Sequence, residues 1–475
     1  MKRCLAVPVV LLGGLNAPVP PARATAFHEK LAAQVAALKA QVEAQSREIA
    51  QLRTDQEGAW LNQRRSEEIK ALVRAVLSDA DTRASLTAGG PSAGSNRKHF
   101  FLASADGSFL MNIGGLVQVR YVANFRATAA HSASLDNESG FEMRRIKIAF
   151  GGHVSDPRIL YKVQLTVDRA TQVVGLDDVW LGYRLADGLM VFGGEFQDRF
   201  SQEGSMSGGR TQTADRSAVD AMFANNDDYV QGIGLDWRPL EALRIGATYN
   251  DGMKSGNFST TATNLTWNST AAEYAVSGRV DVKLAGDFRN SADVEAWTGI
   301  DSPQVFVGGG IHYEHAKAGN AAPPEPAFIP AIPYGELTIW TADALLKYRG
   351  LGLMATGFGL YTGGSTGAEP TSNYAATVQG GYFVIPDVLE PFVRYEYIHP
   401  DPILSGAHDL HLVTAGANWF LHGHHAKFTV DVVWALNNIN SASVLGTSLS
   451  SIGLLMDDPG ATDQVALRAQ FQLLF

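Results

Sequence analysis

The sequence predicts an all-β transmembrane barrel of 16 antiparallel strands, preceded by an N-terminal α-helical coiled coil. Three observations lead to this fold class. The last segment of the chain alternates apolar and polar residues, and segments with the same period of two recur from residue 109 to 475. No segment has the run of about 18 apolar residues that a membrane-spanning helix needs. The chain can therefore cross a membrane only with strands.

The C-terminal segment 464–475 has the clearest pattern. Its odd-numbered positions from Val465 to Phe475 are apolar, and its even-numbered positions are Gln, Ala or Arg except for Leu474. Because strand side chains alternate between two faces, one face suits lipid and the other suits water. A soluble domain can hold such a strand. A chain that ends on one with an aromatic residue resembles the closing strand of outer-membrane β-barrel proteins.

Residues 1–26 are organised like a secretory signal peptide. A short basic start precedes an apolar stretch over 4–15, and 22–26 offer Ala-x-Ala cleavage sites. Cys4 is the only cysteine and lies in this segment. The mature chain would then have no thiol, which excludes disulfide frameworks, cysteine zinc sites and thiol nucleophiles. We therefore expect an exported protein.

Residues 27–83 predict a periplasmic coiled coil. Apolar residues recur there at steps of four and three, as in a heptad seam. The seam is Leu31, Val35, Leu38, Val42, Ile49 and Leu52. So narrow a stripe favours association between copies of the helix, and a lone helix docked on the barrel is the alternative. Residues 84–108 begin with Gly, Ser, Ala and Pro and are expected to form a linker.

Residues 109–475 predict the barrel. The expected strands are 111–126, 140–153, 159–168, 176–185, 188–196, 228–238, 242–250, 274–284, 304–314, 336–348, 351–361, 374–385, 389–398, 409–420, 426–436 and 464–475. Sixteen is an even number, as bacterial barrels require. The connection 285–303 is long where a short turn is due, so 14 or 18 strands stay open. The composition, with 45% hydrophobic residues, fits a barrel with a wet lumen as well as a secreted soluble β-protein.

Four blocks resemble the phosphate-selective porin O/P family of outer-membrane porins. They are 106–121, 140–152 with its Arg144-Arg145 pair, 176–183 and 192–196. The resemblance covers 106–240 by motif and 241–475 by strand rhythm and the final Phe. It implies a homotrimeric, 16-stranded porin of the bacterial outer membrane, with a periplasmic coiled coil, that passes small anions.

Alternation in the first three strands assigns several basic residues to the lumen. Arg or Lys facing lipid at mid-bilayer costs about 2–4 kcal/mol, so residues of the parity opposite to the apolar ones should face inward. These predicted pore-lining residues are Arg120, Arg126, Arg145, Lys147 and Lys162. Arg144 has the other parity and is expected to point outward, near an interface where it can snorkel.

The connection 197–227 occupies the third external position, which in general porins folds into the barrel and sets the constriction. Arg199, Arg210 and Arg216 lie in it, together with several Asp and Glu residues. Because basic rings favour anions, these arginines complete the predicted pore lining. A solvated external loop is the alternative.

The charge balance argues against strong phosphate selectivity. Residues 112–216 hold 12 Lys and Arg against 12 Asp and Glu, whereas 217–475 hold 12 against 26. The acidic second half opposes a positive lumen, so we expect a mild anion preference.

The predicted function is passive diffusion of small hydrophilic solutes, with a mild preference for phosphate-like anions. The alternative is a structural tether, in which the coiled coil grips peptidoglycan or periplasmic partners and the barrel anchors it in outer-membrane lipid. No catalytic set stands out, so we expect no enzyme, and we expect no cofactor, metal or nucleic-acid partner. His422, His424 and His425 crowd one short turn, where exposed polar residues are expected rather than metal ligands.

Overall fold

The computed structural model describes residues 33, 36–48, 90–95, 99–128, 134–167, 174–224, 229–252, 272–316, 334–364, 369–404, 406–445 and 449–475. The chain divides into two units, Met1–Ala84 and Ser85–Phe475. In the first unit, residues 36–48 are helical. The signal peptide and most of the coiled-coil seam lie outside the described residues. Among the described helices, none has the length and apolar character to span a membrane.

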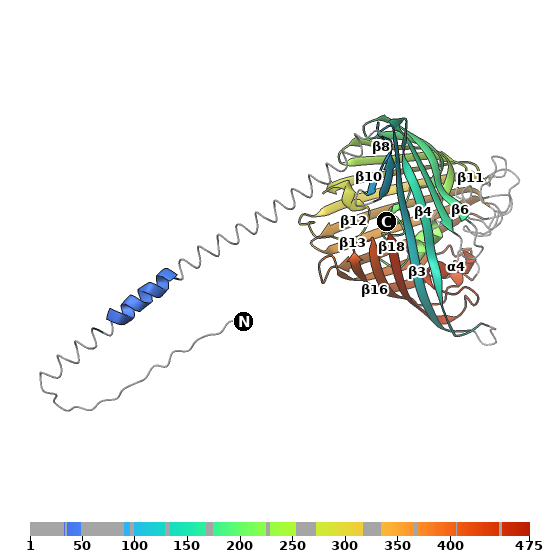
Figure 1. Ribbon diagram of the computed structural model, residues 1–475. Coiled ribbons are helices and arrows are strands. Elements are labelled where there is room, and N and C mark those ends of the chain that lie inside the picture. Colours follow the sequence, from blue (N-terminus) through green and yellow to red (C-terminus); the bar gives the residue numbers. More distant parts are fainter. Residues whose placement is uncertain are drawn as a thin grey trace, which may run out of the picture. The chain divides into compact units, whose positions relative to one another are not determined.

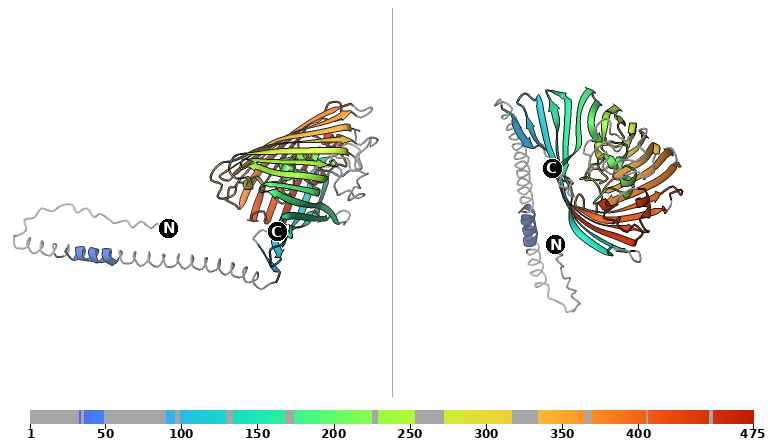
Figure 2. Two further views of the ribbon diagram at one scale, coloured as in Figure 1. Left: turned by 90° about the horizontal axis from the view of Figure 1, so that it is seen from above. Right: turned by 90° about the vertical axis from the view of Figure 1, so that its right-hand side faces the viewer.

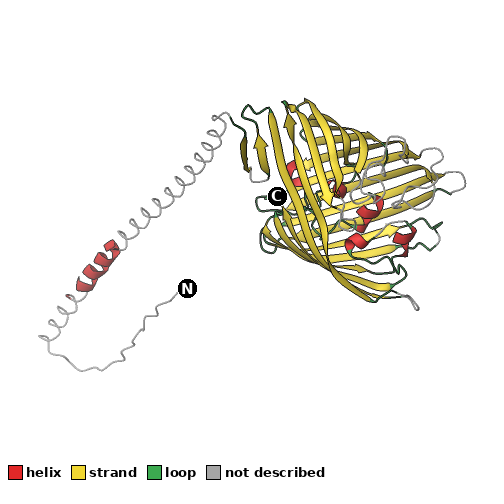
Figure 3. Cartoon of the chain, turned by 45° about the vertical axis from the view of Figure 1, so that its right-hand side comes forward, coloured by secondary structure: helices red, strands yellow, loops and turns green. Residues whose placement is uncertain are grey.

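The second unit is built from strands and few helices (Figure 3). The strands are β1 (Ser92–Ser95), β2 (Phe100–Ala103), β3 (Phe109–Ala127), β4 (Asn137–Val154), β5 (Asp156–Val167), β6 (Val174–Ala186), β7 (Leu189–Gln197), β8 (Tyr229–Leu240), β9 (Leu243–Asn250), β10 (Ala272–Ala285), β11 (Gln304–Ala316), β12 (Tyr334–Tyr348), β13 (Leu351–Gly364), β14 (Thr371–Tyr382), β15 (Leu389–His399), β16 (Leu410–His422), β17 (Ala426–Ala435) and β18 (Thr462–Leu474). The helices are α2 (Gln202–Ser205), α3 (Ala218–Phe223), α4 (Asn440–Val444), η1 (Phe288–Ser291) and η2 (Ser450–Ile452).

Strands β3 to β18 close into one antiparallel barrel. Each pairs with the next, and β18 pairs with β3, which it adjoins in Figure 1. Phe475 extends this closing pair, since its backbone N–H donates to the Gly115 carbonyl over 3.0 Å. Closure leaves no open edge among these strands, as lipid requires. The barrel therefore has the sixteen strands that the sequence predicts, and the alternatives of 14 and 18 are wrong.

The hairpin β1–β2 lies within 84–108, for which the composition predicts a linker. Strand β2 pairs with β3 from Phe100 opposite Ile113 to Ala103 opposite Leu110. The pairing of β18 with β3 stops at Leu116. Strand β2 therefore continues the edge of β3 where β18 ends, and it covers backbone groups that would otherwise be unpaired.

The outer face of the barrel is apolar, as a lipid-facing surface must be. Its exposed side chains include Phe125, Phe141, Leu181, Ile233, Tyr249, Ile311, Trp340, Val378, Trp419 and Phe471. The inward positions between them carry polar and charged groups along much of each strand. This arrangement confirms the predicted alternation.

The two ends of the barrel differ in their connections. Most turns at one end are short, and the loops at the other end are longer. The exception is the connection between β10 and β11, residues 286–303, which contains η1 and folds toward the lumen. Strand β7 is followed by a long connection that enters the barrel, visible as the green segment inside the ring of strands in Figure 2.

Candidate functional site

The structure describes residues 198–224 of the connection between β7 and β8. This segment, here called loop L3, folds into the lumen. Inward side chains hold its backbone carbonyls: Gln118 donates to Gly208 over 3.0 Å, and Lys427 donates to Thr211 over 2.6 Å. Helix α3 is buried along its whole length. Loop L3 is thus a fixed part of the channel interior, and the alternative of a solvated external loop is wrong.

Asp215 is the main attachment of loop L3 to the barrel wall. Its carboxylate accepts hydrogen bonds from Arg120 over 3.2 Å and from Arg145 over 2.8 Å, and it also pairs with Arg144. Burial alone would raise the pKa of Asp215, but the three arginines outweigh burial and hold that pKa well below its ordinary value. Asp215 therefore carries its negative charge inside the barrel and neutralises part of the basic wall.

Arg144 does not point outward, contrary to the alternation. The pairing of β3 with β4 shifts between Gln118 and Val119, because Arg145 lies opposite Gln118 and Met143 lies opposite Val119. Arg144 is the extra residue of a β-bulge, which re-aims side chains locally. The bulge lets both arginines reach Asp215, and it changes the outward positions of the strand from odd numbers, as at Phe141, to even numbers, as at Ile148.

The other predicted residues of the basic wall are also paired with carboxylates. Arg126 contacts Asp457 through two hydrogen bonds of 2.5 and 2.8 Å. The remaining two ion pairs are Lys147 with Asp177 at 2.7 Å and Lys162 with Asp178 at 2.5 Å. The predicted wall is therefore a row of ion pairs, and its net positive potential is weaker than its lysines and arginines alone suggest.

The three predicted arginines of loop L3 have different surroundings. Arg216 is buried and donates to the carbonyls of Gly204 and Met206 within the loop, over 3.2 and 2.7 Å. Arg199 is 63% exposed and pairs with Asp236 at 3.6 Å. Arg210 lines a cavity together with Arg199. Arg216 thus holds the loop together, whereas the other two face open space.

That cavity, of about 530 Å³, has a lining with more basic than acidic residues. Its charged lining is Arg199, Arg210, Arg244, Arg279 and Arg289, with Asp236 and Asp281. Neither Arg210 nor Arg244 forms an ion pair with any residue that the structure describes. Five arginines against two aspartates in the lining give the cavity a positive potential, which enriches anions.

Alternation in β9 and β10 could have found two of these arginines. Tyr249 is exposed on the outer face, so Arg244, which has the other parity, lies inward. Val276 and Val280 are likewise exposed, which places Arg279 inward. Arg289 lies in η1 of the 286–303 connection, and no local pattern places it there.

A second cavity, of about 260 Å³, adjoins the first. Both are lined by Arg199, His99 and Phe475, and the second also by Lys147 and Lys162. The two cavities follow loop L3 on the side of β3 to β10 and reach the end of the barrel where the C-terminus lies. They form a candidate passage with basic walls.

Part of the lumen on the side of β12 to β18 is filled by an apolar cluster. Loop L3 contributes Phe200, Val219, Met222 and Phe223 to it. Inward strand residues, among them Leu337, Ile339, Phe358, Leu360, Leu412 and Val433, complete the cluster with loop residues such as Ile439, Leu449 and Leu454. Packing of this kind excludes water, so the open space of the channel lies against the basic side.

Comparisons with known proteins agree with this architecture. The family model for phosphate-selective porin O and P matches residues 117–292. No curated protein matches the chain. An anion-selective porin from Comamonas acidovorans has a TM-score of 0.50 at 11% identity, covering 77% of this chain and 99% of its own. OprB from Pseudomonas putida, in its high-pH structure, has a TM-score of 0.49 at 11% identity, with 83% and 96% covered.

OmpT of Vibrio cholerae, an outer-membrane protein, has a TM-score of 0.46 at 11% identity, with 77% and 98% covered. At such identities the likeness to the Comamonas porin shows the fold alone. The matched family and the Comamonas protein are porins by name. The family match over 117–292 confirms the predicted resemblance: this part of the chain matches the phosphate-selective porin O and P family.

Proposed function

We propose that this protein is an outer-membrane porin through which small hydrophilic solutes diffuse passively, with a preference for anions. The observation that carries this proposal is the cavity of about 530 Å³ lined by five arginines, two of them without an ion-pair partner among the described residues. The apolar outer face supports an outer-membrane location, and the name of the matched family supports a phosphate-like anion as one solute.

The acidic excess of the second half does not cancel this preference. Several of its carboxylates are used inside the barrel to neutralise buried cations, as Asp343 does for Arg279 at 2.8 Å and Asp431 does for Arg468 at 2.7 Å. Paired carboxylates of this kind add little negative potential to the passage. The preference should still be moderate, because the ion pairs of the first half reduce the positive charge as well.

We expect the double substitution Arg210→Gln and Arg244→Gln to shift the reversal potential toward cations. A unit charge about 10 Å from a passing ion contributes about 0.4 kcal/mol in water, or about a twofold change in local ion concentration. Each charge attracts anions and repels cations, so removal of one charge should lower the anion-to-cation permeability ratio about fourfold and removal of both should lower it about sixteenfold at low salt. Planar-bilayer recordings under a KCl gradient measure this ratio, and high salt should diminish the difference.

The matched control is Arg158→Gln with Arg184→Gln. These two substitutions also remove two positive charges, but from exposed positions outside the two cavities. The control should leave the permeability ratio unchanged. An equal shift in both double variants would mean that overall charge sets the selectivity, and an unchanged ratio in both would remove the cavity from the conducting path.

Trimeric assembly stays a prediction that follows from the coiled-coil seam and the family resemblance. Chemical crosslinking in detergent, followed by sizing, should give a trimer for the full chain. Deletion of residues 27–83 should then leave conductance intact. Only monomers after crosslinking would contradict the coiled-coil role. Within the described residues, nothing favours the tether alternative.

A further inference from the structure

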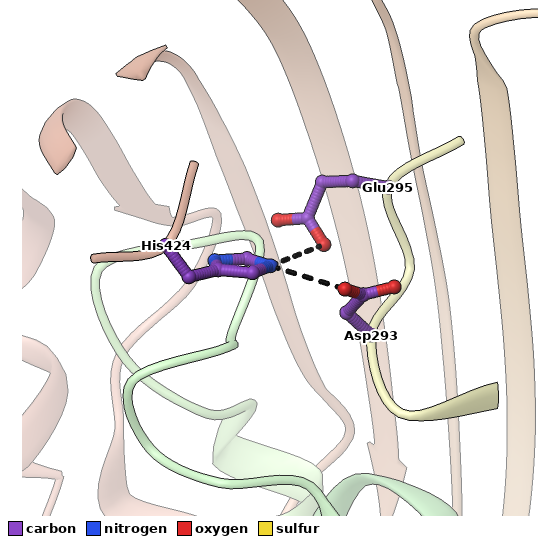
Figure 4. A group of neighbouring side chains, drawn as sticks. All are labelled: Asp293, Glu295 and His424. Atoms are coloured by element: carbon purple, nitrogen blue, oxygen red, sulfur yellow. Dashed lines mark hydrogen bonds and ion pairs between the residues drawn. The ribbon is translucent and has the colours of Figure 1, made fainter. Parts of the chain in front are cut away.

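The turn between β16 and β17 meets the 286–303 connection inside the barrel. His424 is buried, although the sequence pattern predicts an exposed polar residue at this turn. Its Nε2 atom lies 3.2 Å from Asp293 Oδ2 and 3.5 Å from Glu295 Oε2 (Figure 4). One nitrogen and two carboxylate oxygens thus converge within 4.8 Å of one another.

The spacing of these atoms fits a metal ion. Zinc is bound by histidine nitrogen at about 2.0–2.1 Å and by carboxylate oxygen at about 2.0–2.2 Å, mostly in tetrahedral geometry. Neighbouring ligands around such an ion are about 3.3–3.6 Å apart, which agrees with the two distances from the His424 nitrogen. Imidazole with carboxylates is also a ligand set that first-row metals accept.

A buried carboxylate oxygen of the cluster without a hydrogen-bond partner also supports a metal site. Glu295 is 0% exposed, and its Oε1 atom has no hydrogen-bond partner among the residues that the structure describes. A buried carboxylate oxygen without a partner is costly. In Figure 4 the carboxylate of Glu295 is directed at His424. A cation held by this carboxylate would offset the cost.

The surrounding residues hold the three ligands in place. Trp297 donates from Nε1 to Asp293 Oδ2 over 3.1 Å, and its ring lies edge-on to the His424 ring at 5.2 Å. Lys347 pairs with Oδ1 of Asp293, which leaves Oδ2 facing His424. The connection itself packs against β13 at Gly352, where a Cβ atom would lie 2.0 Å from the Val294 carbonyl oxygen. The site is thus built before any ion arrives.

We propose that Asp293, Glu295 and His424 bind one divalent first-row metal ion, with Zn²⁺ the best match to the ligand set. The ion would join the 286–303 connection to the β16–β17 turn and fix that connection inside the barrel. This proposal does not rest on the selectivity of the channel. His422 is exposed in the same turn and supplies a matched control.

The test uses the full chain folded in detergent and stripped of metal with EDTA, which is then removed. Competition against a chromophoric zinc chelator should give one Zn²⁺ per chain for the wild type and for His422→Gln. Loss of a residue that only supports a metal ligand weakens metal affinity by about 10- to 100-fold. Glu295→Gln and His424→Gln each remove a direct ligand, so each should weaken Zn²⁺ binding by more than this. Circular dichroism and heat-modified gel migration check that each variant is folded.

Two results would overturn the proposal. In the first, the wild type binds no more Zn²⁺ than Glu295→Gln. In the second, His422→Gln loses binding while Glu295→Gln keeps it, which would show that exposed histidines alone capture the ion. If Glu295→Gln does not fold, the comparison of His424→Gln with His422→Gln decides the matter, because the two variants remove the same side chain from one turn.

Discussion

Asp215→Asn should destabilise the folded barrel by about 3–5 kcal/mol, since breaking a buried ion pair by removing one partner has a cost of this size. Asparagine keeps the shape of the side chain but removes its charge. Arg120, Arg144 and Arg145 would then face one another without their shared carboxylate. Urea unfolding in detergent micelles, followed by tryptophan fluorescence, measures the loss.

The same substitution should loosen loop L3. Asp215 joins the loop to two adjacent strands, and the positive charges left behind repel one another. Single-channel recordings of Asp215→Asn should therefore show a higher or more variable conductance than the wild type. The anion preference should increase, because the variant removes one negative charge beside the three arginines, of which Arg120 keeps its ion pair with Glu142.

The effect of Asp215 on stability should depend on pH. Its folded-state pKa lies below the ordinary value, so its contribution is fully present above about pH 3.9, the ordinary pKa of Asp. The contribution is lost as the pH falls from there through the folded-state pKa. The difference in unfolding free energy between wild type and Asp215→Asn should therefore be largest near neutral pH and shrink in strong acid.

Glu138→Gln is the control for this experiment. Glu138 also pairs with a lumen arginine, Arg126, at 3.4 Å, but its side chain is 42% exposed. Loss of an exposed pair costs about 0–1 kcal/mol. Equal losses of stability in both variants would contradict the assignment of Asp215 as a buried attachment.

The strand number, order and outward parity could be predicted from the sequence because lipid imposes a strict rule on every second residue. A charged residue on the outer face is costly, so the outward positions stay apolar where a strand crosses the bilayer. Arg120 and Arg145 were placed inward by this rule, and both are buried inside the barrel. The same rule also places Arg244 in β9 and Arg279 in β10 on the inward side.

The bulge at Arg144 could not be predicted in the same way. The inserted residue shifts the outward apolar positions from odd-numbered Phe141 to even-numbered Ile148, which indicates an irregularity but not its position. Nothing in the segment shows that a buried Asp215 attracts the extra arginine. That partner lies 71 residues along the chain. Contacts of this range depend on how loop L3 packs, which local alternation does not encode.

The apolar cluster in the lumen could not be predicted from the alternation rule either. That rule assumes a polar interior, yet Leu337 and Ile339 face inward while Trp340 faces outward. Apolar residues on both faces give a continuous apolar stretch, which cannot be assigned to either side by period alone. The inward apolar residues make sense only with loop L3 present, because its helix α3 packs on them.

Phe223→Ala should have a second large effect, because Phe223 lies in the middle of this packing. Its ring is buried against Phe358 at 5.9 Å between ring centroids. Truncation of a buried Phe to Ala costs about 3–5 kcal/mol through lost burial and the cavity left behind. Urea unfolding should show this loss, whereas Phe100→Ala, at a 58% exposed position of β2, should show little.

The combination of Asp215→Asn with Phe223→Ala tests how loop L3 is held. Asp215 attaches the loop to β3 and β4 by charge, and Phe223 attaches it toward β13 by packing. Two independent attachments should give losses that add to within about 0.5 kcal/mol. A smaller combined loss would mean that release at one attachment already frees the other, so that the loop is held or released as one unit. Equal stability of Phe223→Ala and Phe100→Ala would instead show that the apolar cluster does not anchor the loop.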